Sequence, residues 1–380
     1  MLASGGYGCV FSPAINCDGS ALISNKYVSK VQVYNKYAIR EIKIGKKITE
    51  IIGYPTHFVP IIKHCRVELG EIEDKDHGRC EIFKKRSSNK FTTMKMPFIN
   101  GTDFIDFMIK HKDNDYIVNK LISSYNHLLS SINKLIQNNI LHFDLKGTNI
   151  LFDYDSKLPL IIDFGLSSVI DLDNISDDQM KEIFYVFGPD YYIWPLEVHY
   201  MAYLINENSN PTDDDLIDIV KEFVDNNKGL IQNFSPMFIK KYKEKSVNQL
   251  KFYNSFETFE ERKKYIMGFW TTFDNYSLSI MYLKFIYFIN TTGYTDNKFI
   301  IHFTELLLQN IDPNPENRLD ISDTIQKFNG FLTQDIHVGI KVFKNFKKNF
   351  IDDKKDIDKV LKKERKTGKI ESLKIRKSMS

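Results

Sequence analysis

The chain has 380 residues, which is too long for one compact core and favours two lobes or domains. Hydrophobic residues make up 42% and charged residues 27%, a composition that excludes a disordered or fibrous chain and is typical of a soluble globular protein. The net charge is +3, but residues 341–380 carry 15 Lys/Arg against 6 Asp/Glu, while the rest of the chain carries 37 basic and 43 acidic groups. The basic character therefore belongs to the tail.

The chain opens with a segment that contains three glycines, Leu-Ala-Ser-Gly-Gly-Tyr-Gly-Cys-Val-Phe at residues 2–11. Glycine has no Cβ, so such a segment lets the backbone approach phosphate oxygens closely. Residues 27–33 alternate between apolar and polar, which predicts a strand, and the spacing of apolar residues over 37–48 predicts a helix. Short apolar runs between residues 58 and 96, split by a polar insert at 71–78, fit the remaining strands of a small sheet.

The four cysteines all lie in the first quarter of the chain and form no C-x-x-C pair; they are Cys9, Cys17, Cys65 and Cys80. A reduced, intracellular protein is the simplest interpretation. A zinc site built from His64, Cys65, His77 and Cys80 is a weaker alternative, because its ligand spacing is incomplete. The first residues, which run directly into Gly5 and Gly6, are not expected to form a secretory signal.

A long amphipathic pattern over residues 115–139 predicts a helix that leads into a short polar loop. The loop, residues 141–151, offers an acid at Asp144, a cation at Lys146 and an amide at Asn149. A second apolar run, which starts at residue 160, ends in Asp163 and Gly165. A base near a hydroxyl, a cation for the phosphate and two oxygen ligands for magnesium are the parts of a phosphoryl-transfer site.

The two segments, H-F-D-L-K-G-T-N followed by D-F-G, resemble the catalytic loop and metal-binding motif of eukaryotic-type Ser/Thr protein kinases. The combination is highly specific, whereas a lone D-x-x-x-x-N occurs often by chance. The resemblance implies an α+β, bilobal protein-kinase-like fold with a small β-rich N-lobe and a larger helical C-lobe. The chain is a divergent match, and its Ile-, Lys- and Asn-rich style is similar to that of giant DNA virus kinases.

The resemblance gives the N-terminal residues a role in binding ATP. Ala3 stands where the first glycine of the kinase glycine-rich loop is usual, and the match begins inside the motif, so the first strand is expected to lack its N-terminal half. The nucleotide contacts implied for this loop are Ala3, Ser4, Gly5, Gly6, Tyr7, Gly8 and Val10. Lys30 is expected to pair with the α- and β-phosphates, and Glu41 is favoured over Glu50 as its partner.

Residues 94–103 resemble the kinase hinge. Met96 would be the gatekeeper, Phe98 and Ile99 would border the adenine, and Asp103 would reach the ribose. Pro97 has no backbone N–H, so the adenine is expected to use the backbone of Ile99.

By the same resemblance, Asp144 accepts the proton of the substrate hydroxyl, and Lys146 neutralises the transferring phosphoryl group. Asn149 and Asp163 would hold two magnesium ions. Lys146 favours Ser/Thr over Tyr specificity. Phe143 replaces the arginine that usually meets a phosphate on the activation segment, which here would be residues 165–195. An apolar ring cannot form charge-assisted hydrogen bonds, so residue 143 cannot bind a phosphate on this segment. Activity is therefore expected not to depend on phosphorylation of the segment through this residue.

Trp-Pro-Leu-Glu at residues 194–197 resembles the kinase A-P-E motif with one residue inserted, and Glu197 is expected to form a buried ion pair with Arg318. Residues 273–278 resemble the start of the central kinase helix, and the apolar stretch 269–289 is interrupted by Asp274, Asn275 and Lys284, which favours a buried helix over a membrane span. The family needs far fewer than the 77 residues from Glu197 to Asp274, so residues of about 201–264 are interpreted as a helical insertion.

The expected organisation is an N-lobe at residues 1–98, a C-lobe at 99–331 that includes the insertion, and a basic tail at 332–380. The tail could contact nucleic acid or an acidic membrane surface, or remain a solvated, partly disordered segment.

The expected function is transfer of the γ-phosphate of ATP, with Mg²⁺, to Ser/Thr hydroxyls of a protein substrate. The expected location is the cytoplasm of a cell, or a host cell or virion if the protein is viral. A pseudokinase or scaffold is the first alternative, which Ala3 and the shortened start support and the intact Lys30, Asp144, Asn149 and Asp163 oppose. A small-molecule kinase of related fold is the second, which the A-P-E-like segment disfavours.

Overall fold

The structure is a computed structural model that describes residues 2–4, 8–22, 24–68, 79–84, 90–111, 117–290 and 298–334. Several sequence-based expectations therefore lie outside the described residues. They concern the nucleotide contacts of Gly5, Gly6 and Tyr7, the polar insert with His77, and the basic tail from residue 335 onward.

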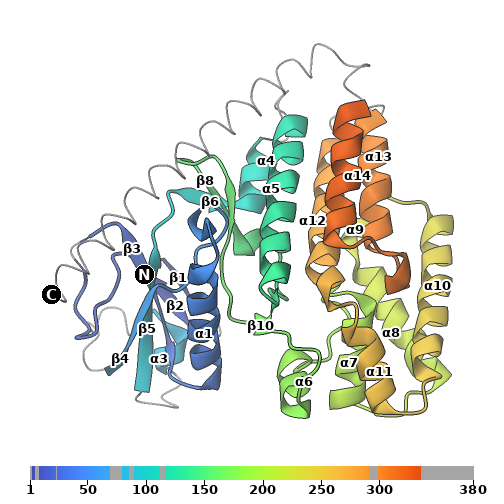
Figure 1. Cartoon of the computed structure of the whole chain (residues 1–380), viewed down its shortest axis with the longest axis horizontal. Helices are drawn as coiled ribbons and strands as arrows, with labels where there is room; N and C mark the ends of the chain where they lie inside the picture. Colours follow the sequence, from blue (N-terminus) through green and yellow to red (C-terminus); the bar gives the residue numbers. More distant parts are fainter. Residues whose placement is uncertain are drawn as a thin grey trace.

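The N-terminal part of the chain forms an antiparallel sheet of five strands in the order β1-β2-β3-β5-β4. Its strands are β1 (Ala3–Ser4), β2 (Cys9–Phe11), β3 (Tyr27–Val33), β4 (Lys63–Glu68) and β5 (Lys90–Pro97). Two helices, α1 (Lys36–Glu50) and α3 (Glu81–Lys84), accompany the sheet, and Figure 1 shows α1 between the sheet and the helical lobe. The predicted strand at 27–33 and the predicted helix at 37–48 are confirmed.

Helix α1 begins at a polar cap and buries one face. The side chain of Asn35 accepts hydrogen bonds from the backbone N–H groups of Tyr37 and Ala38, which satisfies two donors of the first turn. The buried residues recur at helical spacing and are Ala38, Glu41, Ile44, Gly45 and Ile48. Glu41 is the one carboxylate among them, so its charge must be balanced inside the protein.

The expectation of reduced cysteines is wrong for this structure, because all four form disulfides. Cys9 of β2 bonds to Cys80, and Cys17 bonds to Cys65 of β4. Cys9 and Cys65 lie on strands of one sheet, and the two disulfides join cysteines that are 71 and 48 positions apart in the sequence. Since Cys65 and Cys80 are each used in a different disulfide, the zinc alternative loses two of its ligands.

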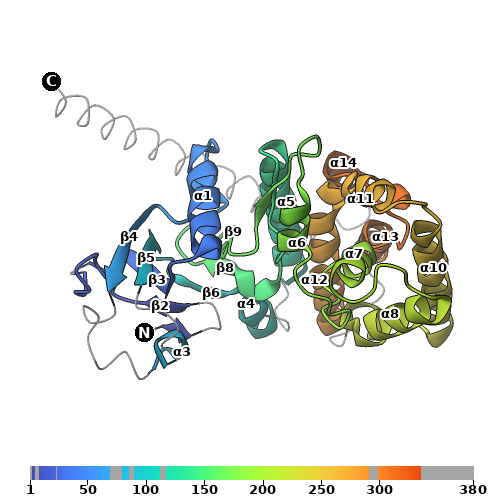
Figure 2. The ribbon, with the colours of Figure 1, turned by 90° about the horizontal axis from the view of Figure 1, so that it is seen from below.

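The rest of the described chain is mostly helical (Figures 1 and 2). Its helices are α4 (Phe104–Lys110), α5 (Ile117–Gln137), α6 (Asp177–Ile183), α7 (Leu196–Asn206), α8 (Asp213–Asn226), α9 (Lys228–Ile231), α10 (Pro236–Asn254), α11 (Phe259–Met267), α12 (Phe273–Asn290), α13 (Lys298–Asn310) and α14 (Ile321–Gln334). Helix α12 lies at the centre of this lobe and packs against α5, α9 and α13. None of the helices within the described ranges is long and apolar enough to cross a membrane.

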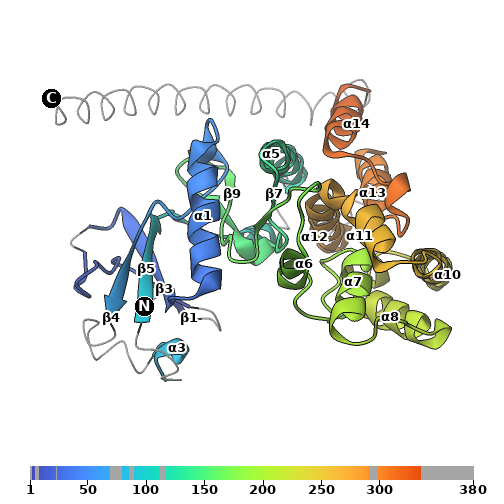
Figure 3. The ribbon, with the colours of Figure 1, turned by 60° about the horizontal axis from the view of Figure 1, so that its bottom comes forward.

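The segment predicted as a helical insertion lies within α7 to α11, so its helical character is confirmed. Helix α8 starts at a capping box in which the side chains of Thr212 and Asp215 each accept a hydrogen bond from the other's backbone N–H. Helices α8 and α10 pack together at the end of the molecule far from the sheet (Figure 3). The hydroxyl of Tyr242 on α10 donates a hydrogen bond to the carbonyl of Ile311, which ties this segment to the end of α13.

Short strands hold the polar loops between the two lobes. Strands β6 (Gly101–Asp103), β8 (Ile150–Asp153) and β9 (Pro159–Ile161) form one small sheet, and β7 (Ile140–Leu141) pairs with β10 (Ser168–Val169). The loop after β7 carries Asp144, Lys146 and Asn149, and the loop after β9 carries Asp163. Pairing of β8 with β9 therefore brings the two predicted motifs next to each other.

Candidate active site

Lys30 joins the two lobes through a pair of carboxylates. Its Nζ lies 2.9 Å from Glu41 Oε1 on α1 and 2.9 Å from Asp163 Oδ1 after β9. Burial by itself lowers the pKa of Lys30, but the two carboxylates outweigh it and the net shift is upward. The lysine is therefore held as a cation. Glu50 lies exposed at the end of α1, so between the two candidate partners the structure pairs Lys30 with Glu41.

Asp163 remains accessible although it is bonded to Lys30. Its side chain is 46% exposed, and its backbone adopts a left-handed conformation with φ of 58°. Burial raises the pKa of Asp163, but Lys30 opposes this and the net shift is downward, so the group is a carboxylate. An exposed carboxylate oxygen beside a cation is suited to bind a hard metal ion.

A cavity of about 420 Å³ lies around these groups. Its lining includes Lys30, Glu41, Asp144, Lys146 and Asp163, and its volume is within the range of about 300–1,000 Å³ that is usual for small-molecule sites. The other lining residues are Ser4, Gly8, Val10, Gln32, Tyr37, Arg40, Gly165, Leu166 and Tyr185. A Cβ at Gly8, the residue before β2, would meet the carbonyl oxygen of Val31 in β3 at 2.9 Å. The close approach of the backbone to β3 at this point therefore requires glycine.

Asp144 is the centre of a second polar cluster. Lys146 Nζ lies 2.9 Å from Asp144 Oδ2, and the Asn149 amide donates to the same oxygen at 2.8 Å. The hydroxyl of Tyr191 donates a hydrogen bond to Asp144 Oδ1 and accepts one from Lys146 at 3.2 Å. Burial and the neighbouring Asp144 carboxylate raise the pKa of Tyr191, so its hydroxyl stays protonated and acts as the donor.

The loop that carries Asp144 is fixed from below by Asp274 at the start of α12. The Asp274 carboxylate accepts hydrogen bonds from the backbone N–H groups of His142 at 2.8 Å and Phe143 at 2.9 Å. The ring of His142 lies 3.1 Å from the carbonyl of Ile162 and contacts the ring of Phe164 edge-on. The same histidine thus links the Asp144 loop to the segment around Asp163.

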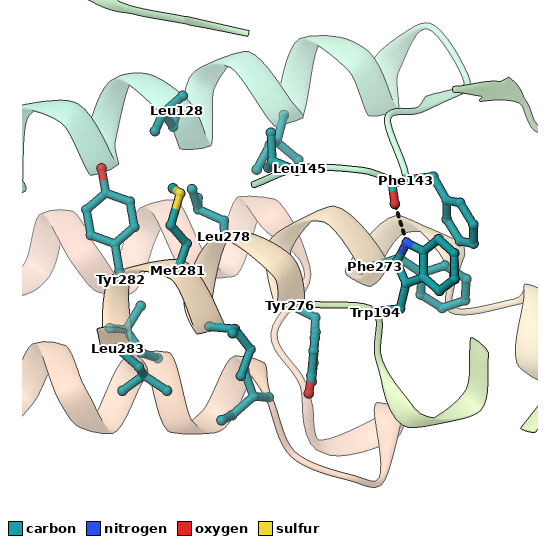
Figure 4. Packing of buried hydrophobic residues seen from close by; sticks show 14 of the residues in the cluster. Leu128, Phe143, Leu145, Trp194, Phe273, Tyr276, Leu278, Met281, Tyr282 and Leu283 are labelled. Carbon is teal, nitrogen blue, oxygen red and sulfur yellow. Dashed lines mark hydrogen bonds between the residues drawn. The ribbon is translucent and has the colours of Figure 1, made fainter. Parts of the chain in front are cut away.

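Phe143 is part of an aromatic cluster where the resemblance would place an arginine. Its ring stacks on Trp194 with 4.8 Å between centroids, and it meets Phe184 edge-on. Trp194 Nε1 also donates a hydrogen bond of 2.5 Å to the carbonyl of Phe143 (Figure 4). The end of the 165–195 segment is therefore attached to the Asp144 loop by apolar packing and a neutral hydrogen bond.

The predicted ion pair between Glu197 and Arg318 is confirmed. Both side chains are fully buried, and two hydrogen bonds of 2.5 and 2.9 Å join the guanidinium to the carboxylate. Arg318 Nε donates a third bond to the carbonyl of Asp312 at 2.7 Å. The remaining face of the guanidinium lies 5.2 Å from the ring of Tyr276. The pair joins the start of α7 to the segment before α14.

The predicted hinge residues lie apart from this cavity, since none of them is among its lining residues. Met96 and Ile99 pack against the buried cluster of Val59, Leu158 and Leu160. The Asp103 carboxylate caps α4 by accepting from the backbone N–H of Asp106 at 2.9 Å.

The N-terminal contacts are distributed unevenly around the cavity. Ser4, Gly8 and Val10 line it. Ala3 of β1 pairs with Val10 of β2 and is not among the lining residues. Asn149 does not line the cavity and lies behind Asp144, to which its amide donates. Lys30, Glu41, Asp144, Lys146 and Asp163 are the predicted charged residues that the fold brings together around the cavity.

The donor atoms fit magnesium in part. Among the described residues no group of three or more His, Cys, Asp or Glu side chains could hold a metal ion alone. Magnesium, however, is usually bound through one or two carboxylates together with substrate phosphates. Asp163 offers such a carboxylate, and the Asn149 amide nitrogen is bonded to Asp144, which leaves the amide oxygen as its acceptor.

Two residues at this site were not assigned a role from the sequence. Tyr191 lies in the 165–195 segment among several other hydroxyl residues, and no local pattern singles it out. Asp274 was noted as part of a motif, and its position at the start of a long apolar helix is a signal, because a carboxylate there must be satisfied by buried donors.

The family model described as protein kinase domain matches residues 1–187, and no curated protein matches the chain. The match spans the glycine-containing segment, Lys30, Glu41, the Asp144 loop and Asp163, and it ends before Glu197 and Arg318. Together with the small sheet and the helical remainder, it shows an α+β bilobal protein-kinase-like fold. The match also supports a protein kinase function for the chain.

Proposed function

We propose that this protein is an ATP- and magnesium-dependent protein kinase that phosphorylates Ser/Thr hydroxyls of protein substrates. The observation that carries the proposal is the position of Lys30, which bonds to both Glu41 and Asp163 at one wall of a cavity that Asp144 and Lys146 also line. A kinase requires this lysine–glutamate pair and the metal-binding aspartate to be in place together.

The chemistry follows from the positions of these groups. Lys30 would hold the α- and β-phosphates, and Asp163 with Asn149 would bind the magnesium ions that neutralise phosphate charge. Asp144 would accept a hydrogen bond from the substrate hydroxyl and take its proton as the new O–P bond forms. Lys146, 2.9 Å from Asp144, would stabilise the negative charge on the transferring phosphoryl group.

The base would be held ready by its surroundings. Asn149 and Lys146 donate to the Asp144 carboxylate, and Asp274 fixes the backbone on its N-terminal side. Such fixed dipoles need little rearrangement when the reaction begins. The Ser/Thr preference rests on the resemblance at Lys146. Ile99 is proposed as the adenine contact, since the Phe98 N–H already donates to the carbonyl of Lys26.

A pseudokinase or scaffold is the second candidate. Two observations favour the pseudokinase. The hydroxyl of Tyr191 is hydrogen-bonded to the Asp144 carboxylate, and the predicted hinge residues do not line the cavity. The two functions differ in whether bound nucleotide leads to transfer.

The test is phosphate transfer from γ-labelled ATP and magnesium to generic Ser/Thr protein substrates, with nucleotide binding measured in parallel by thermal shift. Asp144→Asn should lower transfer by about 10²- to 10⁴-fold, the usual share of a general base, while binding persists. Asp178→Asn, an exposed aspartate on α6, is the matched control and should behave as wild type. Binding without transfer in the wild type would establish the pseudokinase instead.

A further inference from the structure

A second pocket lies next to the candidate active site. Its volume is about 230 Å³, and Lys146 lines both this pocket and the larger cavity. The volume is below the range of about 300–1,000 Å³ that is usual for small-molecule sites, so the pocket fits one amino-acid side chain better than a nucleotide. Because Lys146 also contacts Asp144, a chain whose hydroxyl meets Asp144 would have a neighbouring residue at the mouth of this pocket.

Besides residues 146–148 of the Asp144 loop, three parts of the fold form the pocket walls. Ile105 comes from α4, Ile193 from the 165–195 segment, and Met281, Lys284 and Phe285 from α12. Glycine at position 147 lets the Asp144 loop pack closely against α4, because a Cβ there would meet the Ile105 side chain at 2.3 Å. Figure 4 shows Met281 on the side of α12 that faces Leu145 of the Asp144 loop. The walls are mainly apolar and belong to segments that also position Asp144.

Lys284 gives the pocket its charge. It is half-buried, and within the described part of the chain no carboxylate lies within 4.0 Å of its Nζ. Its ammonium lies 5.9 Å from the centroid of the Tyr192 ring. Burial lowers the pKa of Lys284, which is the cost of removing a cation from water without a compensating anion. No acidic side chain lines the pocket, and its other cation, Lys146, is already paired with Asp144.

An apolar pocket with an uncompensated cation is suited to an acidic side chain. The carboxylate would pair with Lys284, and the methylene groups of the same side chain would contact Ile193, Met281 and Phe285. A basic side chain would bring a second positive charge next to Lys284 and Lys146, and such like-charge contacts are a common device for rejecting wrong partners.

We propose that this pocket selects protein substrates that carry an aspartate or glutamate close to the phosphorylated Ser/Thr, with Lys284 as the residue that determines specificity. The inference rests on the proposed function for its catalytic readout, but the pocket can also be tested by binding alone.

The catalytic test uses a peptide library with one fixed serine acceptor, in which each neighbouring position is in turn Glu, Gln or Lys. For the wild type, we expect kcat/KM to be at least about tenfold higher for Glu than for Lys at one position, which corresponds to ~1.4 kcal/mol. Lys284→Gln should remove the preference, and Lys284→Glu should reverse it. Lys240→Glu, which changes a lysine whose side chain is 80% exposed, is the matched charge control and should keep the wild-type profile. An equal preference in wild type and Lys284→Gln would overturn the inference.

The binding test separates this inference from the kinase assignment. Fluorescence anisotropy measures the affinity of the preferred peptide, in which alanine replaces the acceptor serine. The proteins are the wild type and both Lys284 variants, whose melting temperatures are first compared with that of the wild type to verify folding. Tighter binding of the Glu peptide that is lost in Lys284→Gln supports the pocket even if no phosphate is transferred. Phosphate transfer without any charge preference would support the kinase and contradict the pocket. Binding that does not depend on residue 284 would also contradict it.

Discussion

The hydroxyl of Tyr191 donates a hydrogen bond to the carboxylate of Asp144. Lys146 completes a triangle, since it contacts both the Asp144 carboxylate and the Tyr191 oxygen. A substrate hydroxyl must make the same hydrogen bond to the proposed base. Tyr191 therefore occupies the place of the acceptor, and it must leave Asp144 before a substrate can be phosphorylated.

Removing this hydroxyl should make the enzyme faster. In Tyr191→Phe the ring keeps its contact with Trp194, but the bond to Asp144 is absent. A hydrogen bond to a charged group contributes about 1.5–3 kcal/mol, and part of this would no longer oppose substrate entry. We expect kcat/KM for a protein substrate to rise about three- to tenfold, a gain of ~0.7–1.4 kcal/mol.

Steady-state kinetics with a fixed protein substrate measure this effect. Tyr154→Phe, at an exposed position after β8, is the control and should leave the rate unchanged. A fall in kcat/KM for Tyr191→Phe would mean that the hydroxyl positions Asp144 for catalysis, and the acceptor-like interpretation would be wrong.

Phosphatase treatment should have little effect on the rate. Phe143 is packed between Trp194 and Phe184, so this contact of the 165–195 segment with the Asp144 loop needs no phosphate. Ser167 and Ser168 are buried, and Ser167 donates a hydrogen bond to the carbonyl of His142. The measurement is the initial rate before and after phosphatase, with mass spectrometry to verify removal. A loss of rate greater than about tenfold, or ~1.4 kcal/mol in the barrier, would show that a cation at a position other than 143 binds a phosphate on this segment.

Breaking the Glu197–Arg318 pair should destabilise the fold. Arg318→Ala leaves Glu197 as a buried charge without a partner, which typically costs about 3–5 kcal/mol. We expect the melting temperature to fall by roughly 4–6 °C for a chain of this length. Lys240→Ala breaks an exposed ion pair with Glu244 and serves as the control, with an expected change of less than about 0.5 kcal/mol. An unchanged melting temperature in Arg318→Ala would contradict the importance of the pair.

The parts of the fold that the sequence predicts well depend on contiguous patterns. Alternation over 27–33 predicted β3, and amphipathic spacing over 115–139 predicted α5 with about two extra residues at each end, because burial of one face fixes the period. The bilobal fold and the Glu197–Arg318 pair were predicted from short kinase-like motifs, such as Trp-Pro-Leu-Glu at residues 194–197. Phe143 was recognisable as an altered position for the same reason.

The parts that it does not predict depend on contacts between distant segments. Tyr191 bonds to Asp144 across 47 positions, and Lys284 lines the same pocket as Lys146 only because the fold brings α12 to the Asp144 loop. The spacing of the cysteines likewise contains no sign that β2 and β4 lie in one sheet. Compartment arguments favoured reduced cysteines, whereas the sheet brings them into bonding distance in pairs.

The disulfides lead to a last prediction, which concerns their pairing. Four cysteines can form two disulfides in three ways, and the structure requires Cys9–Cys80 and Cys17–Cys65. In protein folded in a glutathione redox buffer, peptide mapping by mass spectrometry should find these two links. Because they close loops of 71 and 48 residues, each should stabilise the fold by about 4 kcal/mol at most in the chain-entropy account. A reductant should therefore lower the melting temperature of the wild type, and it should leave a variant with all four cysteines changed to serine unaffected. Either of the other two pairings, or a wild-type melting temperature that does not respond to reduction, would contradict this arrangement of the sheet.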